Sequence, residues 1–457
     1  MSPAREGAVV TGLGVLSPLG RGAGAVFEAL TAGRSGIGAV PEGHPAHGWL
    51  SAAGIAPAVD GREVLPPTET RCVDRFVLLA LAAADDALAD AGLVVGRDAD
   101  PHRTAVVLAT GGGGLETFEQ QSHRRLERGR PGVSAYLLPG MLANMATARI
   151  AIKHGIRGYS SAVVTACAAG AQAVAEGLRL IRAGDADVVV CGGSESSLHP
   201  TIAATFANAR ALAQGWDDPE LASRPFDARR NGFVLGEGSA VLVLERAGHA
   251  DARGAAGYAD VIGWGASTDA HHPTMPRPDG AGAADAMRAA IADAGLRPGD
   301  IGYLNAHGTG TRLGDAAEAA AVRSVFGAQG PAVSSTKSAT GHLLGAAGSL
   351  EAAVTTLAVS RGTLPPTLNL TEPDPACDLD HVRGAARTTA LRAALTNAFA
   401  FGGHNLSLVL GPPSTRTART TGRPHRPPAT PHDGSTTAAP PGPPGPPHHP
   451  AARPADH

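Results

Sequence analysis

One cysteine of the chain lies in surroundings that suit a nucleophile. Cys167 stands in the stretch VVTACAAGAQ, after a β-type run and before the small residues Ala168, Ala169 and Gly170. If a helix begins here, its free backbone N–H groups and its dipole lower the pKa of the thiol and hold a developing oxyanion. The small residues leave room for a substrate. A buried structural cysteine is the alternative, and this stretch alone does not separate the two.

Two histidines and a lysine also follow strand-like runs. His307 lies in NAHGTGT, directly after the run IGYL, and is followed by Thr309 and Thr311. His342 lies in SSTKSATGHLLGAAG, five residues after Lys337. A lone histidine is more often structural, but loops of this kind gather at the carboxyl ends of strands in α/β sheets, where ligands bind. We therefore expect the cysteine, both histidines and the lysine to form one site.

A glycine-rich segment, NAFAFGGHN at residues 397–405, is the fourth element of this set. Phe401 is followed by Gly402 and Gly403, and the two glycines predict a flexible loop. The alternative is a simple bulge between two strands.

Two other motifs are similar to ligand-binding motifs, but we do not expect either of them to bind a ligand. The pair His271–His272 in DAHHPTMP has no third metal ligand nearby, so we expect a loop over the entrance of the site rather than a metal site. The stretch GLGVLSPLG is superficially similar to a dinucleotide-binding loop, but Pro18 stands where the following helix should run.

Strand-like and helix-like segments alternate along the chain as far as Gly411, which is typical of an α/β fold. In the first part, buried strands are predicted at residues 7–15, 104–111, 160–166, 186–193 and 239–245, with helices at 77–93 and 170–186. In the second part, strands are predicted at residues 259–267, 301–310, 331–338, 394–403 and 405–411, with a helix at 282–296. The similar order of elements predicts a duplicated α/β unit.

The composition argues against several classes of protein. The 457 residues carry a net charge of −3, so the chain lacks the basic surface that binding of nucleic acid needs. No apolar run is long enough for a membrane helix, and the first residues lack the apolar core of a signal peptide. The cysteines are too few and too scattered for a disulfide scaffold or a zinc site: Cys72, Cys167, Cys191 and Cys377. We therefore expect a reduced, cytoplasmic protein that does not enter a membrane.

The composition changes abruptly after Gly411. Residues 412–457 are rich in proline and contain no hydrophobic residue other than alanine. Such a segment buries too little apolar surface to offset its ordering entropy, so we predict a disordered tail with polyproline character. It is either dispensable or a PxxP-type ligand.

Five motifs together resemble the β-ketoacyl synthases, condensing enzymes of the thiolase-fold superfamily: VVTACAAG, RPFDARRNGFVLGEGSAVLVLE, NAHGTGT, SSTKSATGHLLGAAGSLE and NAFAFGGHN. The elongating class II synthases and the ketosynthases of type II polyketide synthesis are resembled most, over residues 7–411. The resemblance implies a five-layered αβαβα core of two fused halves, residues 7–255 with the cysteine and residues 256–411 with the histidines. It also implies a dimer, either of two copies or with a homologue that resembles a chain-length factor.

The same resemblance implies a role for each candidate residue. Cys167 matches the nucleophile that holds the acyl group. His307 and His342 match the pair that binds the malonyl thioester carbonyl and promotes decarboxylation. Lys337 matches the lysine that supports this pair, and Glu351 is its expected carboxylate neighbour.

Further positions match residues that bind substrate. Thr309 and Thr311 match threonines that hydrogen-bond the pantetheine arm. Phe401 matches a gating phenylalanine whose backbone N–H joins that of the cysteine in an oxyanion hole, with Gly402 and Gly403 supporting the loop. The implied partner is an acyl carrier protein in acyl and malonyl forms. Its phosphopantetheine arm carries the substrates, and no metal or other cofactor is implied.

The acyl pocket is expected at Gly112 and Phe206. Position 112 is often bulky in relatives that limit the acyl chain, so glycine predicts room for longer or bulkier chains. Ala398 and Ala400 stand where the family often has serine and glycine. Because alanine resists a positive φ, we expect the gate loop to move differently from that of typical members.

The implied function is a decarboxylative Claisen condensation of an acyl-primed Cys167 with malonyl-[acyl carrier protein], which yields a β-ketoacyl-[acyl carrier protein] in fatty-acid or polyketide synthesis. One alternative is a non-catalytic partner subunit like a chain-length factor, although such partners typically lack the active cysteine. A second alternative is a thiolase that acts on coenzyme A thioesters. Thiolases use a second cysteine near the C-terminal glycine motif, and NAFAFGG has none.

Overall fold

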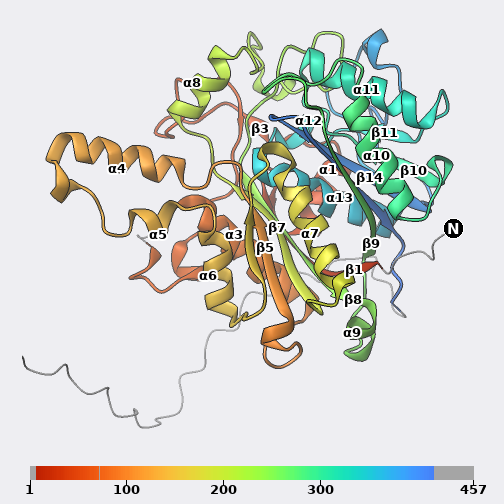
Figure 1. Cartoon of the computed structure of the whole chain (residues 1–457). Helices are drawn as coiled ribbons and strands as arrows, with labels where there is room; N and C mark the ends of the chain where they lie inside the picture. Colours follow the sequence, from red (N-terminus) through yellow and green to blue (C-terminus); the bar gives the residue numbers. More distant parts are fainter. Residues whose placement is uncertain (1–6, 71–72, 416–457) are drawn as a thin grey trace, which may run out of the picture. The chain divides into compact units, whose positions relative to one another are not determined.

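The computed structural model describes residues 7–70 and 73–415 (Figure 1). Cys72 and the predicted disordered tail from residue 416 onward lie outside the described residues. The chain continues in ordered form past Gly411, because the Ser414 N–H donates to Asp260 Oδ2 at 3.0 Å and the Gly257 N–H donates to Thr415 Oγ1 at 3.2 Å. The start of the tail predicted at residue 412 is therefore too early.

One sheet of 11 strands carries the fold. The first part of the chain contributes β1 (Ala8–Ser17), β2 (Gly20–Arg21), β5 (Thr104–Ala109), β6 (Ser160–Val163), β7 (Val188–Glu195) and β8 (Gly238–Arg246). The second part contributes β9 (Ala259–Thr268), β10 (Ile301–Asn305), β11 (Ala332–Ser334), β14 (Ala393–Ala400) and β15 (His404–Gly411). The order across the sheet is β11-β10-β14-β15-β9-β1-β8-β7-β5-β6, and β2 pairs with β1. The two parts join where β1 pairs antiparallel with β9.

The two parts of the sheet repeat one topology. In the first part, β1–β8 and β8–β7 are antiparallel, and β7–β5 and β5–β6 are parallel. In the second part, β9–β15 and β15–β14 are antiparallel, and β14–β10 and β10–β11 are parallel. Each strand of one part thus has a counterpart in the other, which confirms the predicted duplication.

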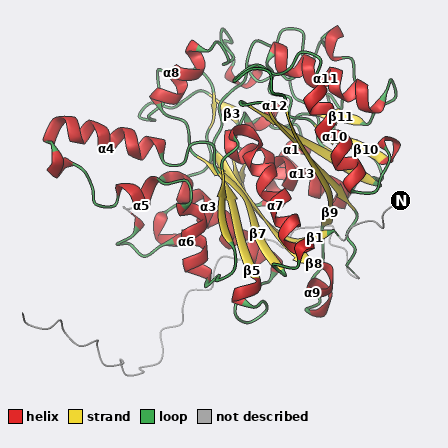
Figure 2. Ribbon diagram, viewed as in Figure 1, coloured by secondary structure: helices red, strands yellow, loops and turns green. Residues whose placement is uncertain are grey.

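Helices cover both faces of each part and make five layers (Figure 2). The outer helices are α3 (Arg75–Ala91) and α6 (Met145–His154) on the first part, and α10 (Ala281–Asp293) and α11 (Arg312–Phe326) on the second. The central layer is α7 (Ala169–Ala183) and α13 (Ala347–Arg361), which pack on each other. Alternate residues of the inner strands belong to the central core and to the outer cores, so these strands are buried on both faces. The edge strand β6 is only half-buried, so the buried strand predicted at residues 160–166 is wrong in its burial, because no described strand covers its outer edge. The predicted αβαβα core is confirmed.

The glycines of GLGVLSPLG serve packing in this fold. A Cβ on Gly14 would lie 1.9 Å from the Ala83 carbonyl oxygen, and one on Gly12 would lie 2.2 Å from that of Ala87. Both carbonyls belong to α3, so these glycines allow α3 to lie directly on β1.

The remaining helices are α1 (Ala23–Thr31), α2 (Gly61–Val64), α4 (Leu115–Arg128), α5 (Leu137–Met141), α8 (Pro200–Asn208), α9 (Ala247–Ala252) and α12 (Lys337–Thr340). The short strands β3 (Ile37–Gly38) and β4 (Ala53–Gly54) pair with each other, as do β12 (Thr363–Leu364) and β13 (Arg387–Thr388). Figure 1 shows that α4 projects from the body of the molecule. Among the described residues, no helix combines the length and apolarity needed to cross a membrane.

Candidate active site

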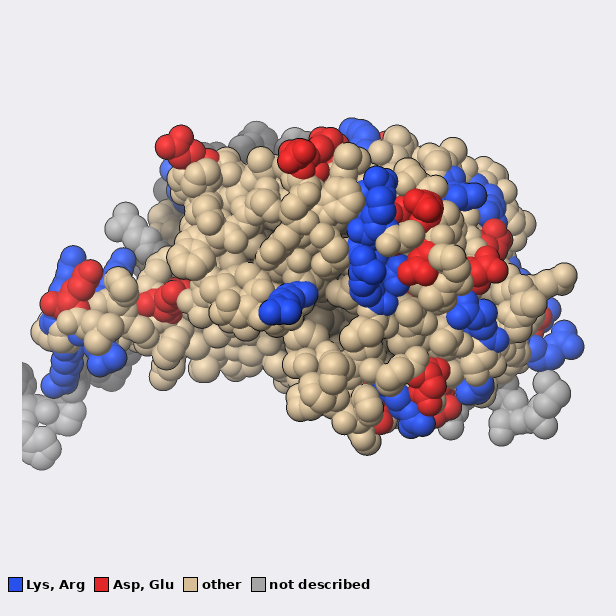
Figure 3. All heavy atoms as spheres, turned by 90° about the horizontal axis from the view of Figure 1, so that it is seen from above, with Lys and Arg blue, Asp and Glu red and all other residues tan. Residues whose placement is uncertain are grey.

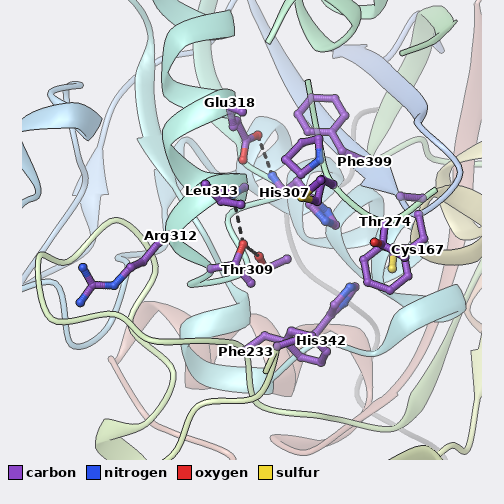
Figure 4. A pocket seen from close by; sticks show the side chains of 18 of the residues that line it. Cys167, Phe233, Thr274, His307, Thr309, Arg312, Leu313, Glu318, His342 and Phe399 are labelled. Carbon is purple, nitrogen blue, oxygen red and sulfur yellow. Dashed lines mark hydrogen bonds between the residues drawn. The ribbon is translucent and has the colours of Figure 1, made fainter. Parts of the chain in front are cut away.

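One cavity of about 460 Å³ opens at the carboxyl ends of the strands (Figure 4). Both parts of the chain line it. Of the predicted residues it contains Cys167, Phe206, His307, Thr309, Thr311, His342 and Phe401. The strand-end loops therefore meet as expected. Lys337 and Glu351 are buried outside this lining.

Cys167 is partly exposed to the cavity at the start of the central helix α7. It lies in the 3-10 turn Ala166–Ala168, which leads directly into the helix. Ala166 has a φ of +47°, a left-handed conformation that stores strain in a residue with a side chain. The chain makes a sharp turn here, and this turn places the thiol at the N-terminus of α7.

The acidity of this thiol differs from the sequence-based expectation. Burial raises the pKa of Cys167 to about 12, against the opposing effect of the Lys337 charge. Desolvation of the thiolate is the cause of this shift, and it opposes the lowering of the pKa that the helix N-terminus is expected to give.

The two histidines face each other across the cavity. The ring centroids of His307 and His342 are 5.4 Å apart, and the ring planes are inclined by 83°. Burial lowers the pKa of both imidazoles well below 6.5, and the charge of Lys337 acts in the same direction. Both rings are therefore neutral at physiological pH, and each carries one N–H that is able to donate to a substrate.

A buried ion pair lies behind the histidines. Lys337, the first residue of α12, donates from Nζ to Glu351 Oε1 of α13. Burial raises the pKa of Glu351 to about 7, although Lys337 opposes this shift. The predicted pairing of these two residues is present, and it fixes the ammonium group near both imidazoles.

Sequence reasoning missed Glu318, which holds the first histidine loop. Its carboxylate accepts from the His307 N–H at 2.9 Å, the Gly308 N–H at 2.7 Å and Asn397 Nδ2 at 3.1 Å (Figure 4). Glu318 belongs to α11 and is 2% exposed. A glutamate in an alanine-rich helix gives no local signal, because only burial distinguishes it from a surface residue.

The two threonines form the wall next to His307. Thr309 Oγ1 and Thr311 Oγ1 are 3.1 Å apart, and Thr311 caps the N-terminus of α11 by accepting from the Gly314 N–H at 3.2 Å. Both threonines line the cavity.

Phe401 lies at the tip of the β14–β15 hairpin and is 41% exposed. Its ring centroid is 6.2 Å from that of Phe206. Gly402 and Gly403 have φ values of +87° and +75°, so this turn needs glycine at both positions. Ala400 pairs with His404 in the hairpin and is not left-handed, so alanine is compatible with the present loop. The expected change in loop motion remains a prediction.

The structure places Gly112 outside the lining of the cavity. A Cβ at this position would lie 2.5 Å from Leu115 Cδ1. Leu115 therefore occupies the space next to Gly112.

The mouth of the cavity carries arginines that sequence reasoning also missed. Arg210, Arg277 and Arg312 line it and are exposed. They come from three separate segments, so no local basic run predicts their proximity. Figure 3 shows a face on which Lys and Arg side chains gather beside a hollow.

The loop after His271 and His272 borders the same mouth. Residues 274–277 line the cavity, which confirms the predicted loop at the entrance. His272 Nδ1 accepts from the Thr274 N–H and the Met275 N–H, both at 3.1 Å, and so shapes the loop. Within the described part of the chain, no cluster of three or more His, Cys, Asp or Glu side chains is arranged to hold a metal ion.

Comparison with known proteins places these features in context. The family model "Beta-ketoacyl synthase, N-terminal domain" matches residues 6–250, and "Beta-ketoacyl synthase, C-terminal domain" matches residues 258–371. The 3-oxoacyl-[acyl-carrier-protein] synthase 2 of Synechocystis sp. is 42% identical over 402 residues, which are 88% of this chain and 96% of that protein.

Two solved structures are similar over 89% of this chain and 99% of theirs. The ishigamide ketosynthase/chain length factor has a TM-score of 0.83 at 35% identity. A type II polyketide ketosynthase, in complex with its acyl-carrier protein and bound to the hexaketide, has a TM-score of 0.82 at 30% identity.

Proposed function

The chain belongs to the β-ketoacyl synthase family, and from this premise we propose which residues perform its reaction. The protein is an acyltransferase that condenses an acyl group with malonyl-[acyl carrier protein] to give a β-ketoacyl-[acyl carrier protein], in type II fatty-acid or polyketide synthesis. The observation that carries the assignment is the single cavity shared by the Cys167 thiol and the two neutral imidazoles of His307 and His342.

The first step loads the acyl group onto Cys167. The sulfur attacks the acyl thioester, a C–S bond forms at Cys167, and the C–S bond to the carrier arm breaks. The proton of the Cys167 thiol passes to the departing thiolate, so a protonated resting thiol is sufficient. We assign the backbone N–H groups of Cys167 and Phe401 to the oxyanion hole of this step.

The second step is decarboxylation of the malonyl group. The bond between the carboxylate and the α-carbon breaks, CO₂ leaves, and the electron pair becomes an enolate with negative charge on the thioester oxygen. N–H donors of His307 and His342 hold this oxygen, and such donors stabilise a developing charge most strongly in a site with little water. The enolate carbon then attacks the acyl group on Cys167, the thiolate leaves, and it takes up a proton.

The partner is an acyl carrier protein whose phosphopantetheine arm enters between the threonines and the gate loop. Thr309 and Thr311 offer hydroxyls to the arm, and the arginines at positions 210, 277 and 312 offer positive charge to its phosphate and to an acidic partner surface. This arm is the only prosthetic group that the proposed chemistry uses. We assign the protein to the cytoplasm, where carrier proteins supply both substrates.

We also propose a dimer across the edge strand β6. The described residues place no strand beyond β6, whereas the opposite edge, β11, is bridged by His381. More than half of the exposed large apolar side chains lie near this edge or on the α4–α5 arm: Phe118, Leu126, Tyr136, Leu138, Leu142, Ile152, Tyr159 and Val164. A strand whose outer edge has no partner, flanked by exposed apolar groups, is a surface that a second copy or a homologous chain covers.

The division of the catalytic core into halves at residues 7–255 and 256–411 follows the repeated topology. The acyl pocket extends from Cys167 past Phe206, whose ring contacts those of Phe233 and Phe401. Cys167 is the single cysteine among the described lining residues, which supports a catalytic synthase over a thiolase or a chain-length-factor-like subunit.

The test is incubation with acyl- and malonyl-carrier proteins, read by mass spectrometry of protein and products. Cys167→Ala is expected to lose the acyl adduct and the β-ketoacyl product, whereas Cys191→Ala, at a buried cysteine of β7 outside the cavity, retains both. Condensation by Cys167→Ala would show that another group holds the acyl chain.

A further inference from the structure

The motif RPFDARRNGF, residues 224–233, buries two arginines that no step of the reaction uses. Arg224 and Arg230 are each 2% exposed and belong to the largest fully buried side chains. Neither lines the cavity, but residues 231–233 of the same motif do. A buried guanidinium group is costly to desolvate and must be compensated by hydrogen bonds. The partners of these hydrogen bonds therefore show which segments each arginine positions.

Arg230 binds the back of the threonine loop. Its Nε–H donates to the Thr311 carbonyl at 3.3 Å, and its Nη2–H donates to the Arg312 carbonyl at 3.0 Å. Its Nη1–H donates to Asp374 Oδ2 at 2.6 Å and to the Asp227 carbonyl at 3.0 Å. One planar group thus connects the start of α11 to two other segments of the protein.

The threonine loop is also held at Gly310, the residue before Thr311, by the carboxylate of Asp315 next to Arg230. Asp315 Oδ1 accepts from the Gly310 N–H at 3.1 Å, and Asp315 Oδ2 lies 3.4 Å from Arg230 Nε. The Gly232 N–H of the motif donates to the Gly310 carbonyl at 3.1 Å. The backbone between Thr309 and Arg312 is therefore fixed from the side away from the cavity.

We propose that Arg230 is a positioning residue for binding of the pantetheine arm. It touches no substrate, but it fixes the carbonyls of Thr311 and Arg312 and so the direction in which the threonine hydroxyls and the Arg312 side chain face the cavity. This inference rests on the proposed contact between the threonines and the arm. His307 is held separately by Glu318, so the effect of Arg230 is on binding of the arm rather than on decarboxylation.

Lysine cannot replace this arrangement, although it keeps the charge. Its single ammonium group has no fixed fork, so it does not reach two neighbouring carbonyls and Asp374 together. Arg230→Lys therefore keeps a positive charge beside Asp315 and Asp374 but loses the fixed hold on the two carbonyls. Arg224→Lys is the matched control, because Arg224 is equally buried in the same motif but its guanidinium group binds the Asp227 carboxylate and the Asn369 carbonyl and forms no hydrogen bond with the threonine loop.

The experiment compares malonyl-pantetheine, which has the full arm, with malonyl-N-acetylcysteamine, which lacks most of it, on the acyl-loaded enzyme. Arg230→Lys is expected to raise KM for malonyl-pantetheine about tenfold, the worth of one misaligned hydrogen-bond contact, with kcat unchanged. KM for the truncated substrate stays as in the wild type. Arg224→Lys is expected to leave KM unchanged for both substrates.

A second variant covers a failure of Arg230→Lys to fold. Asp374→Asn removes the charge of the partly exposed carboxylate that anchors Arg230, which weakens this anchor, and it is expected to shift KM for malonyl-pantetheine in the same direction by a smaller factor. Equal effects on both substrates, or a fall in kcat alone, would make Arg230 merely structural and overturn the inference. The double variant Thr309→Val/Thr311→Val tests the contact with the arm separately from the positioning by Arg230. If this variant leaves the ratio of the KM values for the two substrates unchanged, the proposed contact between the threonines and the arm is wrong.

Discussion

Cys167 and Gly345 occupy equivalent positions in the two parts of the molecule. Each is the middle residue of a 3-10 turn that opens a buried helix of 15 residues, α7 after Cys167 and α13 after Gly345. The first residue of each turn is left-handed, with φ of +47° at Ala166 and +45° at Leu344. One copy of this turn carries the proposed nucleophile, and the other carries no side chain at the equivalent position.

The absence of a side chain at Gly345 has a steric reason. A Cβ there would lie 2.2 Å from the Gly111 backbone nitrogen and 2.7 Å from Glu195 Oε2. Glu195 accepts from the N–H groups of both glycines, at 2.5 Å from Gly111 and at 3.0 Å from Gly345. This carboxylate connects the turn after β5 to the turn that follows His342.

We expect Gly345→Ala to separate these turns. The free energy of unfolding should fall by about 1–3 kcal/mol, as for overpacked cores, and condensation should fall with it because His342 precedes this turn closely. Urea unfolding and product formation measure the two effects. Gly38→Ala is the control, since a Cβ at Gly38 meets nothing within 4 Å. An unaltered Gly345→Ala enzyme would contradict the close approach.

Substitutions in the Lys337–Glu351 pair should distinguish its effect on stability from its effect on catalysis. Lys337→Met leaves Glu351 buried without its cation, which costs about 3–5 kcal/mol in the free energy of unfolding. Lys337→Met with Glu351→Leu should recover most of this stability, because both charges are then removed, but not the rate of CO₂ release. Urea unfolding and CO₂ release from malonyl-carrier protein distinguish the variants. A double variant as unstable as the single one would refute this account.

The neutral histidines predict an acid-dependent loss of stability. Their folded pKa values lie well below the usual 6.5, so below about pH 6.5 the unfolded chain binds protons that the folded chain does not. The free energy of unfolding should therefore fall as pH falls, by up to about 1.4 kcal/mol per pH unit for each histidine.

Glu351 acts in the opposite direction. Its raised pKa of about 7 favours the folded state as pH falls through that value, so the wild-type profile contains both effects. The histidine part is isolated by comparison with His307→Gln/His342→Gln, whose unfolding free energy should decrease less between pH 6.5 and pH 5 (roughly the window below the unfolded pKa). Parallel profiles of the two proteins would show that the histidines are not depressed.

Gly112 lies outside the described lining of the cavity, so its expected influence on the length of the accepted acyl chain comes from the resemblance to the family and not from the cavity. Isoleucine at this position must displace the end of Leu115, and the two side chains then compete for one space. We expect Gly112→Ile to retain turnover of short acyl chains and to lose turnover of long ones, measured with acyl-carrier proteins of increasing length. Equal turnover of long chains by wild type and Gly112→Ile would exclude this role.

The edge of β6 should control assembly. Val164 is 54% exposed directly after this strand, so Val164→Asp is expected to shift the protein toward a monomer in light scattering. Val94→Asp, at a residue 49% exposed elsewhere, should leave the mass unchanged. An unchanged mass for Val164→Asp would place the interface on another surface.

Much of the fold follows from sequence alone. The strands of GAVVTGLGV, TAVVLATG and SAVLVLE are recognisable because strands buried on both faces are apolar throughout. Cys167, His307 and His342 stand out because each follows a strand-like run within a glycine-rich or small-residue motif, and strand ends of one sheet meet at one edge.

Other properties depend on contacts between segments far apart in the chain. Burial raises the pKa of the Cys167 thiol, and this burial comes from segments that surround the thiol in the fold rather than from the local helix start that the sequence shows. In sequence, Glu318 and Arg230 resemble surface residues. In the structure both are buried, and they bind the backbone of the loops that carry His307 and Thr311. Local pattern determines which elements form and where their reactive residues lie. Only the packed structure decides which charges are buried and which carbonyls and N–H groups they hold, because desolvation depends on every segment that surrounds a group.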